Sequence, residues 1–232
     1  MSSLAAAAWR YDREPGDLTW PCALSPIGST SHRPAETLPG MRLFVALVPP
    51  AAVLDEIAAE INRLRSAAPE LRWAKRDQWH LTLAFLGEVE ERRTPGLAER
   101  LGRAAHRHDA FDLSFSGGGR FTHSILWAGV RGDRDRLRAL AGSVAAAARR
   151  AGVDLVDRPY RPHLTLARSR ARGDVDLRPL VASVADFAGT PWTADAIHLI
   201  QSRLGANPTY TTLGSWPLRA ARAGGGKPPE TG

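Results

Sequence analysis

The sequence predicts an α+β fold of two similar lobes, in which mainly antiparallel sheets face a central cleft and helices cover the outside. Two observations carry this prediction. The tetrapeptide His-Leu-Thr-Leu occurs at 80–83 and again at 163–166. Each copy also falls within the same expected order of strand, helix, motif strand and helix. We therefore expect a degenerate internal duplication, a pseudo-twofold domain whose two motif strands face one another.

The first half begins with an apolar run that Pro49-Pro50 brings to an end. The following segment repeats apolar residues at three- and four-residue steps, which is typical of an amphipathic helix. Glycine at position 87 closes the first motif strand. In this half we expect strands at 41–48, 71–73 and 79–86, a turn at 75–77, and helices at 51–68 and 91–107.

The second half has the same kinds of pattern. Gly117 to Phe121 contains three successive glycines and is interpreted as a turn or bulge rather than a phosphate-binding loop, because no helix that begins with Lys and Ser or Thr follows. In this half we expect strands at 111–116, 125–130, 163–168, 192–202 and 209–218, and helices at 137–151 and 175–187.

The composition divides the chain into three parts. Residues 1–40 are rich in Ser, Pro, Ala and Gly without a sustained period, and are expected to be a disordered or loosely packed extension. Residues 41–218 form the predicted domain. Residues 219–232, with three successive glycines and Pro228-Pro229, are expected to be a disordered tail.

Composition also excludes several classes of protein. No apolar run is long enough to cross a bilayer, and no basic region precedes the alanine run near the start, so neither a membrane protein nor a secretory signal is expected. Cys22 is the single cysteine, which excludes an internal disulfide and a cysteine-built zinc site. These features predict a cytoplasmic protein.

The net charge of +7 lies mostly in the predicted domain. A basic balance favours a polyanionic partner such as nucleic acid, although it is also common in chains that are merely soluble.

The repeated motif points to a particular chemistry. On a strand, alternate side chains share a face, so each motif presents an imidazole and a hydroxyl together. A neutral histidine can take a proton from water while a protonated one gives a proton to a leaving oxygen. Threonine hydroxyls can hold phosphate oxygens. The motifs predict metal-independent cleavage of a phosphate ester, with His80 and His163 as acid and base and with Thr82 and Thr165 on the phosphate.

The paired motif and the run from Met41 to Leu47 resemble the two-histidine phosphoesterases, and most closely the RNA 2′,3′-cyclic phosphodiesterases, also called 2′-5′ RNA ligases. The resemblance covers roughly residues 41–218. It implies opening of an RNA 2′,3′-cyclic phosphate end to a 2′-phosphate, with no cofactor and no metal, and with joining of RNA ends as the reverse reaction. It also implies a phosphate contact at Arg168. A monomer is expected.

The position of Arg168 raises a geometric question, because a side chain five residues after His163 points to the opposite face of a regular strand. A bulge or a strand end would be needed to bring it to the site. Arg161, Tyr160 and Phe121 are weaker candidates for contacts with the substrate, since aromatic residues on strands more often belong to the core.

Other polar residues are given structural or surface roles. Arg158, Arg170 and Arg172 are assigned to the outer cleft or to solvent. The remaining histidines of the domain lack the neighbouring carboxylates or cysteines that a metal site needs; they are His106, His108, His123 and His198.

Three alternatives remain open from the sequence. The chain could act on 2′-5′ oligonucleotides or on a small cyclic phosphate such as ADP-ribose 1″,2″-cyclic phosphate. It could be an RNA-binding module without turnover. A metal-dependent phosphodiesterase is the third alternative, which the lack of nearby acidic ligands disfavours.

Overall fold

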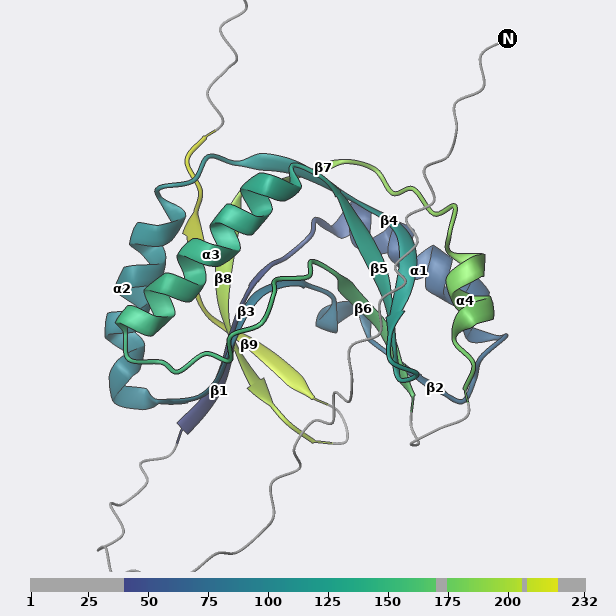
Figure 1. Cartoon of the computed structure of the whole chain (residues 1–232), viewed down its shortest axis with the longest axis horizontal. Coiled ribbons are helices and arrows are strands. Elements are labelled where there is room, and N and C mark those ends of the chain that lie inside the picture. Colours follow the sequence, from purple (N-terminus) through teal and green to yellow (C-terminus); the bar gives the residue numbers. More distant parts are fainter. Residues whose placement is uncertain (1–39, 170–174, 206–207, 221–232) are drawn as a thin grey trace, which may run out of the picture. The chain divides into compact units, whose positions relative to one another are not determined.

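The computed structural model describes residues 40–169, 175–205 and 208–220, which form two antiparallel sheets with helices on their outer faces (Figure 1). All of the predicted extension except Gly40, and most of the predicted tail, lie outside the described residues. Sheet A has the order β3-β1-β8-β9, and sheet B has the order β2-β6-β5-β4-β7. Sheet A consists of β1 (Gly40–Leu47), β3 (Leu81–Glu90), β8 (Ala196–Arg203) and β9 (Thr209–Pro217). Sheet B consists of β2 (Leu71–Trp73), β4 (Phe111–Phe121), β5 (Ile125–Gly132), β6 (Leu164–Ser169) and β7 (Trp192–Ala194).

The helices connect the sheets crosswise. They are α1 (Ala51–Arg65), α2 (Thr94–Ala105), α3 (Arg134–Arg150) and α4 (Arg178–Ser183), with 3₁₀ turns η1 (Arg76–Gln78) and η2 (Glu91–Arg93). Helix α1 follows a strand of sheet A but packs on sheet B, where Ile57 and Ile61 line one small cavity together with Leu166. Helix α3 follows a strand of sheet B but packs against β3 of sheet A. Each half therefore covers the other with its first helix, as Figure 1 shows.

The strand order confirms the predicted duplication. In each half an early strand pairs with the motif strand, as β1 pairs with β3 and β5 pairs with β6. The order β3-β1-β8-β9 in sheet A matches β6-β5-β4-β7 in sheet B, and β2 extends sheet B by one further strand. Apolar side chains of both halves form one continuous core, with Leu81 and Leu164 fully buried in it. The α+β, two-lobed architecture follows from this arrangement.

The interpretation of Gly117–Phe121 as a turn or bulge is correct for a bulge and wrong for a turn. These residues continue β4, which is paired with β5 on both sides of an irregularity between Phe115 and Gly118. The glycines are needed for packing, because a Cβ atom on Gly119 would lie 2.2 Å from the indole ring of Trp127. A Cβ atom on Gly118 would lie 2.2 Å from Val184. A glycine run in a sequence often indicates a turn, whereas here Gly119 leaves room for the indole ring of Trp127.

Two further expectations were wrong in detail. The single strand expected at 192–202 is two strands, because β7 pairs with β4 of sheet B and β8 pairs with β1 of sheet A. The chain passes from one sheet to the other at Asp195, a change that an unbroken apolar pattern does not reveal. The helix expected at 175–187 is reduced to α4, Arg178–Ser183.

Candidate active site

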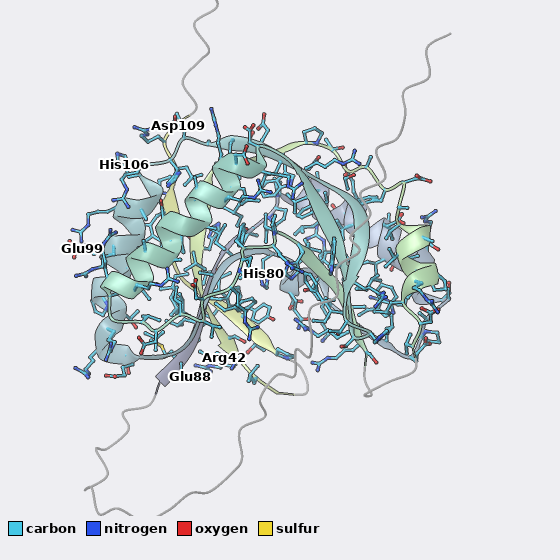
Figure 2. The ribbon with its side chains drawn as sticks, in the orientation of Figure 1. Arg42, His80, Glu88, Glu99, His106 and Asp109 are labelled. Carbon is cyan, nitrogen blue, oxygen red and sulfur yellow. The ribbon has the colours of Figure 1, made fainter. Side chains whose placement is uncertain are left out.

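Both motif histidines lie directly before their strands rather than within them. Strand β3 begins at Leu81 and β6 begins at Leu164, one residue after His80 and His163 respectively. Figure 2 shows His80 between the two sheets, whereas His106 and Glu99 lie on the outer side near α2. The buried leucines at the strand starts hold each imidazole at the edge of the core.

The two imidazoles are held in the same way. The Nδ1 atom of His163 donates a hydrogen bond to the carbonyl oxygen of Arg161 at 2.7 Å. His80 makes a hydrogen bond to the backbone of Gln78, which is also two residues before it. Because a carbonyl oxygen only accepts, Nδ1 of His163 carries a proton and Nε2 of the neutral ring has a free lone pair. The short stretch before each strand therefore fixes both the ring orientation and the tautomer.

Aromatic rings surround both imidazoles. Phe44 stacks on His80 with ring centroids 4.5 Å apart, and Tyr210 meets the same imidazole edge-on at 5.4 Å. In the other half, Phe121 meets His163 edge-on at 4.7 Å. Phe44 lies on β1 and Tyr210 on β9, so sheet A itself supplies the rings around His80. These contacts restrict the rotation of both imidazoles.

Burial keeps both histidines neutral. The pKa of His80 is lowered from 6.5 to about 4, mainly by burial and also by the charges of His163 and Arg168, while the hydrogen bond to Gln78 opposes the decrease. Burial also lowers the pKa of His163, with the charge of Arg168 adding to the effect and the hydrogen bond to Arg161 opposing it. The effect of His163 on the pKa of His80 means that the folded chain brings both motifs to one place.

Each motif strand contains a bulge at the same position. In the pairing of β1 with β3, Val45 lies opposite Ala84 and Ala46 lies opposite Thr82, so Leu83 has no register partner. In the pairing of β5 with β6, Leu126 lies opposite Ala167 and Trp127 lies opposite Thr165, so Leu166 is skipped in the same way. The extra residue shifts the alternation of faces by one position from there on.

The bulges change which side chains reach the site. Thr82 and Phe85 lie on one face of β3, opposite Ala46 and Phe44, and Thr165 and Arg168 lie on one face of β6. Neither threonine hydroxyl has a hydrogen-bond partner among the residues that the structure describes. The bulge thus answers the geometric question about Arg168, whose charge acts on both histidines.

Phe85 is a site residue that the sequence reasoning missed. Its side chain is 61% exposed, and its ring lies 6.2 Å from that of Phe44. It occupies the place in the first half that Arg168 occupies in the second, five residues after the histidine. An alignment of the two motifs, extended one residue past the shared alanine, pairs Phe85 with Arg168 and would have identified Phe85.

The weaker candidates take different positions. Tyr160 is half-buried, and its hydroxyl donates a hydrogen bond to the carbonyl oxygen of Thr82 at 3.2 Å. Burial raises the pKa of Tyr160. The side chain of Arg161 is exposed, while its carbonyl accepts the bond from His163. Tyr160 thus ties the approach to the second motif onto the first motif strand.

The other predicted histidines have different surroundings. His108 bonds the hydroxyl of Ser143 at 2.8 Å. His198 bonds the hydroxyl of Ser215 at 2.8 Å and lies opposite Ala46, which in turn lies opposite Thr82, so His198 is on the same face of sheet A as Thr82. His106, His123 and Arg158 are exposed, and Arg170 and Arg172 are outside the described residues. Among the described residues, no group of three or more His, Cys, Asp or Glu side chains could hold a metal ion. In the same part of the chain, no helix combines the length and apolarity needed to span a membrane.

Comparison with known proteins identifies the family. Residues 53–206 match the 2′-5′ RNA ligase superfamily. The RNA 2′,3′-cyclic phosphodiesterase of Escherichia coli K12 is 32% identical over 179 residues, covering 76% of this chain and 96% of that protein. The protein of the same name from Geobacillus stearothermophilus is 30% identical over 163 residues, covering 68% of this chain but only 51% of the relative.

Solved structures of similar fold include two bacterial proteins. The crystal structure of E. coli LigT complexed with 3′-AMP superposes with a TM-score of 0.62 and 28% identity, covering 77% of this chain and 98% of that one. The crystal structure of TT0787 of Thermus thermophilus superposes with a TM-score of 0.65 and 28% identity, covering 78% of this chain and 99% of that one.

Proposed function

Because the chain belongs to the 2′-5′ RNA ligase superfamily, we propose that it hydrolyses the 2′,3′-cyclic phosphate end of RNA to a 2′-phosphomonoester. One observation is the main support for this proposal. Two neutral imidazoles, each hydrogen-bonded to the backbone two residues before it, lie close enough for His163 to lower the pKa of His80. Relatives named RNA 2′,3′-cyclic phosphodiesterase support the substrate class.

The reaction needs one histidine in each protonation state. The neutral imidazole takes a proton from water as the water oxygen bonds to phosphorus. The P–O3′ bond breaks in line with this attack, and the protonated imidazole gives its proton to O3′. Water is consumed, the phosphate stays on O2′, and the two histidines end with their protonation states exchanged. The matched geometry of His80 and His163 suits either role.

The threonine that each motif contains supports phosphate binding. The hydroxyls of Thr82 and Thr165 donate to the non-bridging oxygens, and Arg168 neutralises the charge that builds on them. Arg168 is exposed, yet its charge acts on both imidazoles, so a phosphate bound between them lies within its reach. The site supplies all of these groups from its own side chains, and we propose that no metal takes part.

The exposed ring of Phe85 supports a nucleotide rather than a bare cyclic phosphate as substrate. The ring of Phe44 contacts both the imidazole of His80 and the ring of Phe85 on one face of sheet A. A nucleobase can therefore stack on Phe85 while the phosphate lies at His80. The reverse reaction would join a 2′,3′-cyclic phosphate to a 5′-hydroxyl as a 2′-5′ linkage, with the same groups acting in reverse order.

The test is turnover of a short RNA that ends in a 2′,3′-cyclic phosphate, in excess EDTA, for the wild type and for His80→Ala and His163→Ala. We expect a 2′-phosphate product and a loss of at least about 10²-fold in each variant. The variant His106→Ala serves as a matched control, since that histidine is exposed on the outer side near α2 (Figure 2).

Each other outcome would favour an alternative. Turnover of 2′-5′ oligonucleotides or of ADP-ribose 1″,2″-cyclic phosphate, without turnover of the RNA end, would move the assignment to those substrates. Binding of RNA without any turnover would indicate a binding module. Loss of activity in EDTA would indicate a metal-dependent enzyme.

We also propose a cytoplasmic monomer. The RNA substrate and the single cysteine, Cys22, are consistent with a reducing compartment. Light scattering after gel filtration would test the monomer, and fractionation of cells would test the compartment.

A further inference from the structure

A second polar pair lies on the face of sheet A that carries Thr82. His198 on β8 is the register partner of Ala46 on β1, and Ala46 is the register partner of Thr82 on β3. Ser215 on β9 lies opposite His198 in turn, and its hydroxyl oxygen is 2.8 Å from the Nδ1 atom of the imidazole. Register partners point to the same face of a sheet, so these four side chains form one row across sheet A.

The row lies on the face of sheet A that is turned away from α2. Ile197 and Trp216 are the chain neighbours of the polar pair, and they point to the opposite face because successive strand side chains alternate. Trp216 meets α2 there, since a Cβ atom on Gly102 would lie 2.9 Å from its indole ring. His198 is half-buried and Ser215 is exposed, so a ligand bound on this face can reach the pair.

The corresponding row of sheet B is filled by an aromatic ring. Thr165 lies opposite Trp127, and Trp127 lies opposite Gly119. The indole of Trp127 covers Gly119, where an added Cβ atom would be 2.2 Å from the ring. Sheet A therefore offers a further hydrogen-bonding contact beside its threonine, at a place that sheet B fills with an apolar ring.

The polar pair suits a hydroxyl group better than a phosphate. Burial lowers the pKa of His198, against the charge of Asp195, and so favours the neutral imidazole. Among the described residues, the Nε2 atom of His198 has no hydrogen-bond partner. Because the Ser215 hydroxyl can either donate to Nδ1 or accept from it, Nε2 is free to accept or to donate. A ribose hydroxyl also donates and accepts, whereas an ionised phosphate only accepts.

The place of the pair indicates which hydroxyl it meets. In the proposed function the terminal base stacks on Phe85 of β3, and the reacting phosphate lies at Thr82 of the same strand. The base and the 5′ chain leave opposite sides of a ribose ring, so the 5′ chain runs away from β3, across β1 towards β8. Neighbouring strands lie about 4.8 Å apart, so the backbone of His198 is about 10 Å from that of Thr82. That span reaches the preceding nucleotide.

We propose that His198 binds the 2′-hydroxyl of the nucleotide immediately 5′ to the reacting one, and that this contact makes the enzyme select ribose over deoxyribose there. The inference rests on the proposed function, in which Phe85 stacks on the terminal base and the threonines hold the reacting phosphate. Ser215 is a positioning residue that orients the imidazole. The 2′-hydroxyl is the group by which a protein distinguishes an RNA strand from a DNA strand.

The experiment compares two dinucleotides with the same terminal 2′,3′-cyclic phosphate, one with ribose and one with 2′-deoxyribose in the 5′ nucleotide. For the wild type we expect kcat/KM to be about five-fold to ten-fold higher for the ribose dinucleotide. In His198→Ala this ratio should approach one. His198→Gln should keep part of the ratio, because a carboxamide also donates and accepts. If His198→Ala does not fold, Ser215→Ala gives the second test and should lower the ratio.

A matched control is His108→Ala, which removes another histidine that bonds a serine hydroxyl, that of Ser143 on α3, at 2.8 Å. It should keep the wild-type ratio. Equal losses on both dinucleotides in His198→Ala would overturn the proposal, because His198 would then support the fold or contact another part of the substrate. A wild type that turns over both dinucleotides equally well would overturn it too.

Failure of the proposed function would give a different result, since the wild type would then turn over neither dinucleotide. In that event, the affinities of the two uncleaved dinucleotides, measured by calorimetry for the wild type and His198→Ala, would test the hydroxyl site. Tighter binding of the ribose dinucleotide that depends on His198 would support the site, and equal affinities would refute it.

Discussion

Leu83 and Leu166 occupy the same place in the two halves of the domain. Each follows its motif histidine by three residues, is buried, and is skipped in the pairing of its strand. The duplication therefore extends beyond the repeated tetrapeptide to a repeated irregularity of the backbone. Because of it, the residue five positions after each histidine faces the site, and the two halves use that position differently. One presents Phe85 and the other presents Arg168.

Replacing Phe85 by alanine should weaken the interaction with the substrate while leaving the fold intact. The side chain is 61% exposed, so its removal should leave the melting temperature within about 2 °C of the wild type. Loss of a stacked base should lower kcat/KM about ten-fold, and Phe85→Tyr should retain most of the activity. Val156→Ala, a truncation at a residue that is 74% exposed, is the control. Unchanged kinetics in Phe85→Ala would remove this residue from the site.

The pH dependence of kcat/KM should be bell-shaped, with its alkaline limb below pH 6.5. Catalysis needs one neutral and one protonated imidazole, and the two histidines titrate as a pair. The pKa of both histidines is lowered, mainly by burial, and that of His80 is about 4. As the pH rises, the histidine that acts as the acid therefore loses its proton below about pH 6.5, the pKa of an ordinary histidine. In Arg168→Gln the limb should move to higher pH, because a positive charge near both imidazoles is removed.

Stability should follow the same protonation. The unfolded chain binds protons at its histidines below about pH 6.5, whereas folded His80 resists protonation down to about pH 4. The stabilisation is therefore complete above the unfolded pKa and is lost as the pH falls between these values. Circular dichroism should accompany the rate measurements so that acid unfolding is not mistaken for the acid limb. An alkaline limb above pH 7 in the free enzyme would contradict the lowered pKa of both histidines.

The sequence was sufficient for the architecture and for the paired motifs, because hydrophobic period and a repeated tetrapeptide are both local signals. It was insufficient where the position of a side chain depends on how its strand pairs with a neighbouring strand. Arg168 needed the register of β6 against β5 to be placed, and Phe85 needed the register of β3 against β1. The passage between sheets at Asp195 likewise depends on which strands pair. Bulges and pairings arise from contacts distant in sequence, which no period of 2 or 3.6 records.

Tyr160→Phe should misplace the two halves of the site relative to one another. The change removes one hydroxyl, whose bond to the carbonyl oxygen of Thr82 measures 3.2 Å and joins the approach of the second motif to the first motif strand. A loss of about 1 kcal/mol in the free energy of unfolding is expected, which corresponds to a decrease of about 2–4 °C in Tm for a domain of this size. A positioning role also predicts a several-fold decrease in kcat with little change in KM. A decrease in Tm alone, with kcat preserved, would leave Tyr160 a purely structural residue.

Gly119→Ala should disturb His163 indirectly, by displacing the ring of Trp127. The new Cβ atom would lie 2.2 Å from the indole of Trp127, so that ring must move. Trp127 lies 5.4 Å from Phe121 and 6.5 Å from His163 between ring centroids, and Phe121 packs edge-on against the same imidazole. Overpacking of this kind costs about 1–3 kcal/mol in the free energy of unfolding. Displacement of both rings should also lower kcat, since the orientation of His163 depends on them.

The matched control for this substitution is Gly142→Ala in α3, where a Cβ atom meets nothing within 4 Å. There alanine should stabilise the helix by about 0.5–1 kcal/mol. Chemical denaturation and steady-state kinetics on both variants separate the effect on stability from the effect on catalysis. If Gly119→Ala matched the wild type in stability and in kcat, then neither Trp127 nor the glycine run could be needed to position His163.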